Sequence, residues 1–147
     1  MKLTTAWIGK TKSPAIQSLT EQYLKRLRQF SDVEGVSLKD EAALLKMCGR
    51  EGRGARRALV LFDSQGKQLS SEEFARFLGE RLERNPLPLV FAIGPADGFS
   101  ETARHQADHM LSLGKITIAH ELARVVALEQ LYRAFTILKG HPYHLGH

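Results

Sequence analysis

The sequence predicts an α/β fold with a largely parallel sheet. Strand-like and helix-like segments alternate along its 147 residues, which is the pattern of consecutive βα units. Two short, largely apolar runs, at residues 58–62 and 87–93, are typical of strands buried on both faces of such a sheet. No linker, repeat or low-complexity stretch interrupts the alternation. Residues 1–147 are therefore expected to form a single domain.

Strands are predicted where short apolar runs lie between turn residues. They are expected at residues 3–9, 33–38, 58–62, 87–93 and 113–118. The third run leads into Asp63-Ser64-Gln65-Gly66, a composition typical of turns, so the strand should end there.

Helices are predicted where a capping residue precedes apolar residues spaced three and four apart. They are expected at residues 13–30, 41–48, 70–84, 100–110 and 121–139. Ser13 precedes Pro14, which suits a first helical turn, and Ser70 with Glu73 has the spacing of a capping box. Ser100 is a further cap. After the second helix, glycines interrupt a basic tract that ends at Arg57, so a mobile loop or frayed helix is expected there.

Composition restricts the compartment more than the activity. The net charge of +5 suits either a polyanionic partner or a basic protein with no such partner. Cys48 is the only cysteine, which excludes an internal disulfide and fits a reducing cytosol; its apolar surroundings favour a core role over a nucleophilic one. No segment resembles a membrane helix or a signal peptide, so we expect a cytoplasmic protein.

The turn after residues 87–93 carries glycines at Gly94 and Gly98. Ligands of open α/β sheets bind at the carboxyl ends of strands, and glycine permits close backbone approach. A plain strand-to-helix turn would use the same residues. The spacing is neither a dinucleotide-binding fingerprint nor a phosphate loop.

The segment 116–138 predicts a strand followed at once by a long helix, with a short loop whose backbone groups suit an adenine edge. Arg124, Glu129, Tyr132 and Arg133 lie among the apolar positions of that helix. Their alternative interpretation is a solvated face with one salt bridge, because Glu129 and Arg133 are four residues apart.

The tail ends in His141-Pro142-Tyr143-His144-Leu145-Gly146-His147. We expect no metal site, because Pro142 and Gly146 preclude a regular helix and no carboxylate or cysteine is near. The open alternatives are a disordered tail and a cluster that stacks on, and hydrogen bonds to, a nucleobase.

Three of these motifs occur together in one family: the turn from Ile93 to Ser100, Leu131-Tyr132-Arg133-Ala134, and His141-Pro142-Tyr143-His144. In this order, over essentially the whole chain, the sequence resembles the RlmH family of bacterial ribosomal RNA methyltransferases. The resemblance implies a SPOUT fold, a mostly parallel sheet flanked by helices whose C-terminal part is threaded into a trefoil knot. It also implies a homodimer with its site at the subunit interface.

The resemblance further implies S-adenosylmethionine (SAM) as methyl donor and, as substrate, N3 of a pseudouridine in large-subunit (23S) RNA of the assembled ribosome. The implied SAM-binding positions are Phe62, Gly94, Gly114, Lys115, Ile116, Thr117, Ile118 and Ala119. The implied catalytic positions are Arg124, Glu129, Arg133, Tyr143 and His144.

Among these, the two arginines would hold phosphate or polarise the base, and Tyr143 would stack on it. The N3 proton needs an acceptor, for which His120, His144 and Glu129 remain open.

The chain departs from the family pattern at the glycine turn and in the tail. Pro95 and Asp97 stand where the family usually has glycine and glutamate, and Leu145 stands where it has a basic residue. Ala119 and Glu121 replace common prolines. The rival hypothesis is a non-catalytic ribosome-binding or RNA-binding module on the same fold. Its RNA contacts would come from Arg50, Arg53, Arg56 and Arg57.

Overall fold

The computed structural model describes residues 2–50, 52, 55–84 and 87–145. The strands are β1 (Lys2–Ile8), β2 (Asp32–Leu38), β3 (Ala58–Gln68), β4 (Leu89–Ile93) and β5 (His109–Ser112). The helices are α1 (Pro14–Leu27), α2 (Glu41–Met47), α3 (Ser71–Arg84), α4 (Glu101–Gln106) and α5 (His120–Leu138). A 3₁₀ turn, η1 (Pro142–Leu145), follows α5.

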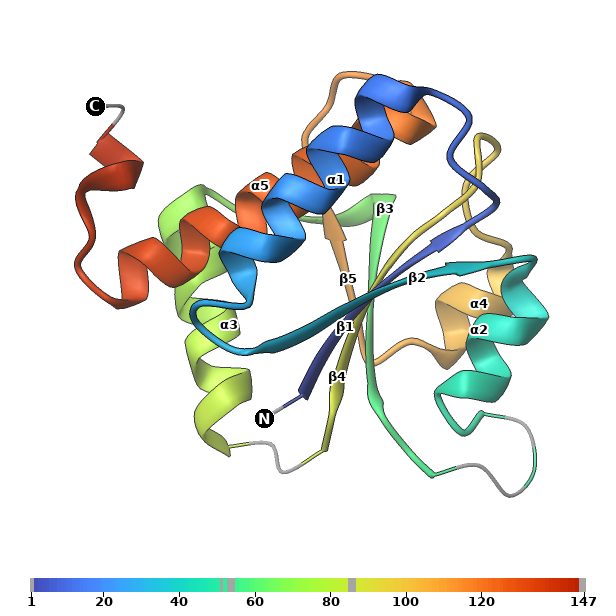
Figure 1. The fold of residues 1–147 in the computed structure, drawn as a ribbon. Helices are drawn as coiled ribbons and strands as arrows, with labels where there is room; N and C mark the ends of the chain where they lie inside the picture. The colour runs from blue at the N-terminus through green and yellow to red at the C-terminus, as the bar shows by residue number, and fades with distance from the viewer. Residues whose placement is uncertain (1, 51, 53–54, 85–86, 146–147) are drawn as a thin grey trace.

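The strands form one parallel sheet in the order β2-β1-β4-β3-β5, which confirms the predicted fold class. Helices α1, α3 and α5 cover one face of this sheet, and α2 and α4 cover the other (Figure 1). Successive residues of β4 alternate between the two layers: Phe91 packs under the three-helix layer, and Val90 and Ala92 pack under the two-helix layer. Both cores are apolar, as the continuous apolar runs predict.

Local capping explains where helices α1, α3 and α4 begin. Ser13 Oγ accepts a hydrogen bond from the Ile16 amide, and Ser100 Oγ accepts one from the Ala103 amide. Ser70 and Glu73 form the predicted capping box, with reciprocal bonds of 3.1 and 2.8 Å. The first helix ends at Leu27, three residues before the predicted end.

The strand predicted at residues 113–118 is wrong. The fifth strand lies earlier, at His109–Ser112, and α4 ends at Gln106 rather than at 110. The cause is Asp108, whose carboxylate accepts bonds from the Leu59 amide at 2.8 Å and from Arg50 at 2.7 Å. These bonds fix the chain beside β3, so that His109 to Ser112 pair with it and residues 113–118 become a loop.

The turn predicted after Phe62 is also wrong, because β3 continues to Gln68. Its pairing with β5 is interrupted after Phe62 and resumes at Lys67, so the predicted turn is an irregularity within a strand. The predicted loop near residues 49–57 lies partly outside the described residues, Arg53 and Gly54 included. Cys48 is buried, as a core role requires.

Within the described ranges, none of the helices combines the length and hydropathy needed to span a membrane. The same part of the chain contains no group of three or more side chains suited to hold a metal ion.

Candidate active site

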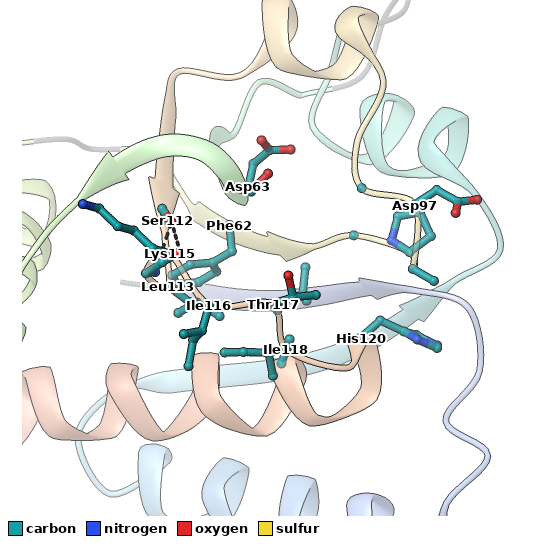
Figure 2. A pocket seen from close by; sticks show the side chains of 18 of the residues that line it. Phe62, Asp63, Asp97, Ser112, Leu113, Lys115, Ile116, Thr117, Ile118 and His120 are labelled. Carbon is teal, nitrogen blue, oxygen red and sulfur yellow. Dashed lines mark hydrogen bonds between the residues drawn. The ribbon is translucent and has the colours of Figure 1, made fainter.

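A cavity of about 540 Å³ opens at the carboxyl ends of β3, β4 and β5. The side chains and backbone around it come from strand ends, the glycine turn and the loop before α5 (Figure 2). Most of the expected cofactor positions line it: Phe62, Gly94, Gly114, Lys115, Ile116, Thr117 and Ile118. Ala119 does not line the cavity and occupies the N-cap position of α5.

The loop wall of this cavity offers its backbone to a ligand. Ser112 Oγ donates to the Gly114 carbonyl at 2.9 Å and accepts from the Gly114 amide at 3.1 Å. Gly114 has a φ of +121°, a conformation that side chains rarely adopt. Among the described residues, the backbone groups of 115–118 make no hydrogen bonds with protein. Amide and carbonyl groups are therefore available beside the apolar side chains of Phe62 and Ile118.

Sequence reasoning missed a polar wall on the strand side of the cavity. Asp63, almost fully buried, accepts bonds from the Gln65 amide at 2.9 Å and from Arg104 Nε at 3.2 Å. Arg104 also donates to Glu101 at 2.7 Å, and these bonds raise its pKa. In the sequence, Asp63 directly follows the apolar run at residues 58–62, and this position was the available signal. Its surroundings predicted a turn instead.

A second polar cluster surrounds the far end of α5. Arg133 donates to both carboxylate oxygens of Glu129, from Nη2 at 2.7 Å and from Nε at 3.4 Å, which is the salt bridge that the spacing predicted. The Tyr143 hydroxyl donates to the same carboxylate at 2.8 Å. Burial raises the pKa of Tyr143, and hydrogen bonds with Tyr23 and Glu129 raise it further. The tail is thus held in a turn by side-chain bonds.

The contacts of His144 fix its tautomer. Arg133 Nη1 lies 3.2 Å from His144 Nδ1, and a guanidinium can only donate, so Nδ1 is the unprotonated nitrogen. His144 Nε2 then carries the proton and donates to Glu72 at 2.7 Å. Both ring nitrogens are occupied, and Glu72 on α3 is a contact that sequence reasoning missed.

Arg124 lies apart from this cluster. Its side chain is buried, with only 1% of the residue exposed, and donates to the Ile8 carbonyl and to Thr11 Oγ1, each at 2.9 Å. Burial lowers its pKa. In this position the guanidinium joins α5 to the end of β1, and a phosphate would have to displace these bonds.

The second polar cluster, hereafter the tail cluster, consists of Glu129, Arg133, Tyr143 and His144 with Glu72. The cavity and the tail cluster lie at opposite ends of α5. His120, the first residue of the helix, lines the cavity, and Arg133 lies thirteen positions later. At 1.5 Å per residue this separates them by about 20 Å along the helix. Within one chain, the structure does not bring the expected cofactor positions and the expected catalytic positions together.

In the described part of the basic tract, Arg50 and Arg56 are already paired. The Arg50 side chain is 3% exposed and donates to Asp108, to the Gln106 carbonyl, and to the carbonyls of Cys48 and Arg57. Arg56 also pairs with Asp108. These contacts give Arg50 a structural role and weaken the hypothesis of a binding module built on this tract.

Several known proteins are similar to this chain in sequence or in fold. A family model described as "Predicted SPOUT methyltransferase" matches residues 1–144. The ribosomal RNA large subunit methyltransferase H of Koribacter versatilis is 55% identical over 147 residues, covering 100% of each chain. That of Geotalea daltonii is 39% identical over 154 residues, covering 98% of this chain and 99% of its own. The SpoU methyltransferase AviRb from Streptomyces viridochromogenes, solved with AdoMet, is 15% identical with a TM-score of 0.49, over 90% of this chain and 57% of that chain.

Proposed function

The chain belongs to the RlmH family of SPOUT methyltransferases, and from that premise we propose that it transfers a methyl group from SAM to N3 of a pseudouridine in large-subunit ribosomal RNA. The observation that carries the proposal is the cavity at the ends of β3, β4 and β5, which gathers nearly all the implied cofactor positions. The trefoil knot stays a prediction of the family resemblance.

The residues of the cavity fit SAM chemically. Its volume of about 540 Å³ lies within the usual range of small-molecule sites. Phe62, Ile93 and Ile118 offer apolar contact for an adenine ring, and the unpaired backbone groups of 115–118 offer hydrogen bonds for its edge. Asp63 and Arg104 supply opposite charges for the zwitterionic end of the molecule. When bound, SAM supplies an electrophilic methyl group.

Among the three candidate proton acceptors, we propose His120. It lines the cavity, and its ring makes no hydrogen bond with other described residues. His144 has both nitrogens occupied, and the Glu129 carboxylate already accepts bonds from Arg133, Tyr143 and Gln130. Replacing His120 with Gln should slow methyl transfer about a hundredfold with unchanged SAM affinity. An unchanged rate would remove His120 from this role.

We further propose that two copies of the chain build each site. In an isologous dimer whose two-fold axis passes perpendicular to α5 near its middle, the two copies of the helix run antiparallel, so each end of α5 lies beside the opposite end in the partner. Exposed apolar residues lie at both ends: Ile116 and Leu122 near the cavity, and Leu138 and Leu145 near the tail cluster. Such an interface would cover these residues and bring the tail of one copy to the cavity of the other.

Mixed dimers test this arrangement. Gly114→Val should disable the cavity, since a β-branched residue is strained at the φ of this position, and Tyr143→Ala should disable the tail. If the site is shared, dimers that combine the two inactive chains contain one intact site and regain part of the activity. Mixtures that stay inactive, although both variants fold and dimerise, would contradict the shared site.

The proposed activity itself is tested with labelled SAM and ribosomes from cells that lack the modification. We expect label in large-subunit RNA, at N3 of a pseudouridine, and SAM binding by calorimetry. A chain that neither binds SAM nor labels the RNA would overturn the proposal. Label on a different nucleotide or atom would retain the methyltransferase and correct its target.

A further inference from the structure

Arg26, in the last turn of α1, lies close to two tyrosine rings beside the tail cluster. Its guanidinium carbon is 5.3 Å from the centre of the Tyr23 ring and 5.6 Å from that of the Tyr132 ring. Both distances are within the range of cation–π attraction, which holds the guanidinium near the rings without using its N–H groups. Among the described residues Arg26 makes no ion pair or side-chain hydrogen bond. It is exposed, so its donors face solvent.

Arg133 is in the opposite situation. Glu129 neutralises it through two bonds, and Nη1 donates to both Nδ1 and the carbonyl oxygen of His144. Its remaining capacity to bind a phosphate is small, because most of its N–H groups are already used. The cation that the sequence singled out therefore organises the tail, and Arg26 carries the free charge next to it.

A row of ring contacts connects the two arginines. Arg26 lies over Tyr132, whose ring centre is 4.7 Å from that of Tyr143, and Arg133 lies 5.1 Å from the Tyr143 ring centre. The aromatic row thus begins at the tail residue implied to stack on the substrate base and ends at an unpaired guanidinium on α1. Aromatic rings followed by a free arginine are the combination that binds nucleotides through base stacking and phosphate contact.

We propose that Arg26 is a phosphate-binding residue of the RNA substrate, held in place by Tyr23 and Tyr132. The inference rests on the proposed function and adds an RNA contact from α1 to the tail cluster. The ligand is a backbone phosphate adjoining the target nucleotide, so Arg26 contributes to substrate affinity and leaves the bond-forming step to other residues.

The test compares Arg26→Ala with Lys25→Ala on the full-length protein. Lys25 is the neighbouring exposed cation, so its removal changes the net charge and the helix terminus to the same extent. Arg26→Ala should raise the KM for ribosomes roughly tenfold, since a charge-assisted phosphate contact is lost, with kcat and SAM affinity unchanged. The slope of log K against log salt concentration for ribosome binding should become shallower by about 0.7–0.9, the value for one lost phosphate contact. Lys25→Ala should change KM less than twofold.

Arg26→Lys keeps the charge but loses the planar fork, so it should fall between the wild type and Arg26→Ala. If Arg26→Ala and Lys25→Ala had equal effects, Arg26 would act only through the net charge of the protein, and the proposal would be overturned. A lower melting temperature for Arg26→Ala with unchanged KM would show a purely structural stack and also overturn it. A wild-type protein that fails to bind SAM or to methylate ribosomes would instead refute the proposed function, so the two failures are distinguishable.

Discussion

The cavity is formed mainly by the backbone, whereas the tail cluster is formed by side chains. The cavity depends on the path of the backbone: strand ends, a glycine turn and a loop with free amide and carbonyl groups. The tail cluster depends on side-chain bonds between residues of α3, α5 and the C-terminal turn. Changes in backbone packing should therefore affect SAM binding, and changes in side-chain charge should affect RNA and methyl transfer.

The largest effect is expected at Gly66, beside the cavity. A Cβ at this position would lie 2.6 Å from backbone atoms of Met110 and Leu111, so β5 would have to move. Gly66→Ala should destabilise the fold by about 3 kcal/mol or more and abolish SAM binding. Gln65→Ala, in the same segment, is the control and should be nearly neutral. Denaturant unfolding and calorimetry measure both quantities. Normal SAM affinity in Gly66→Ala would show that the cavity tolerates movement of β5.

Arg124, near the cavity end of α5, gives the next largest effect. Arg124→Ala leaves the Ile8 carbonyl without this donor and creates a buried void, so the protein should lose about 2 kcal/mol of unfolding free energy. Arg124→Met refills the volume without a buried charge and should lose less. If both variants stay stable but no longer methylate ribosomes, Arg124 reaches RNA as the family resemblance implied, and its structural role is secondary.

The same division explains what could be predicted from the sequence. Apolar runs and caps identified the sheet, the helices and their order, because these depend on local patterns. The position of the fifth strand could not be read in this way, since it depends on bonds from Asp108 to residues about fifty positions earlier in the chain. The buried Asp63 beside Arg104, and Glu72 bound to His144, were missed for the same reason. The motifs identified the loop that lines the cavity. Its distance from the tail cluster, at the other end of α5, is visible only in the folded structure.

Glu129 tests whether side-chain charge in the tail cluster affects methyl transfer without affecting SAM binding. Glu129→Gln removes the charge that holds Arg133 and Tyr143, so stability should fall by about 1 kcal/mol. Methyl transfer should fall about a hundredfold through misplacement of the tail, with SAM affinity within twofold of the wild type. Glu83→Gln, an exposed change of the same charge on α3, is the control. A large loss of SAM affinity in Glu129→Gln would show that the tail contributes to the cofactor pocket directly.

The smallest effect is expected for the pH dependence of stability, through Glu121 at the cavity end of α5. The amides of Ser13 and Lys12 donate to Glu121 at 3.0 Å each, and these bonds lower the pKa of the carboxyl below its usual 4.5. Because the pKa is lower in the folded state, the stabilisation is complete above pH 4.5 and is lost as the pH falls through the lowered value. Glu121→Gln should therefore melt slightly below the wild type at neutral pH, and the difference should close as the pH falls through the lowered pKa of Glu121. A difference in melting temperature that persists unchanged in acid would mean that the carboxylate charge is not what holds the start of α1 against α5.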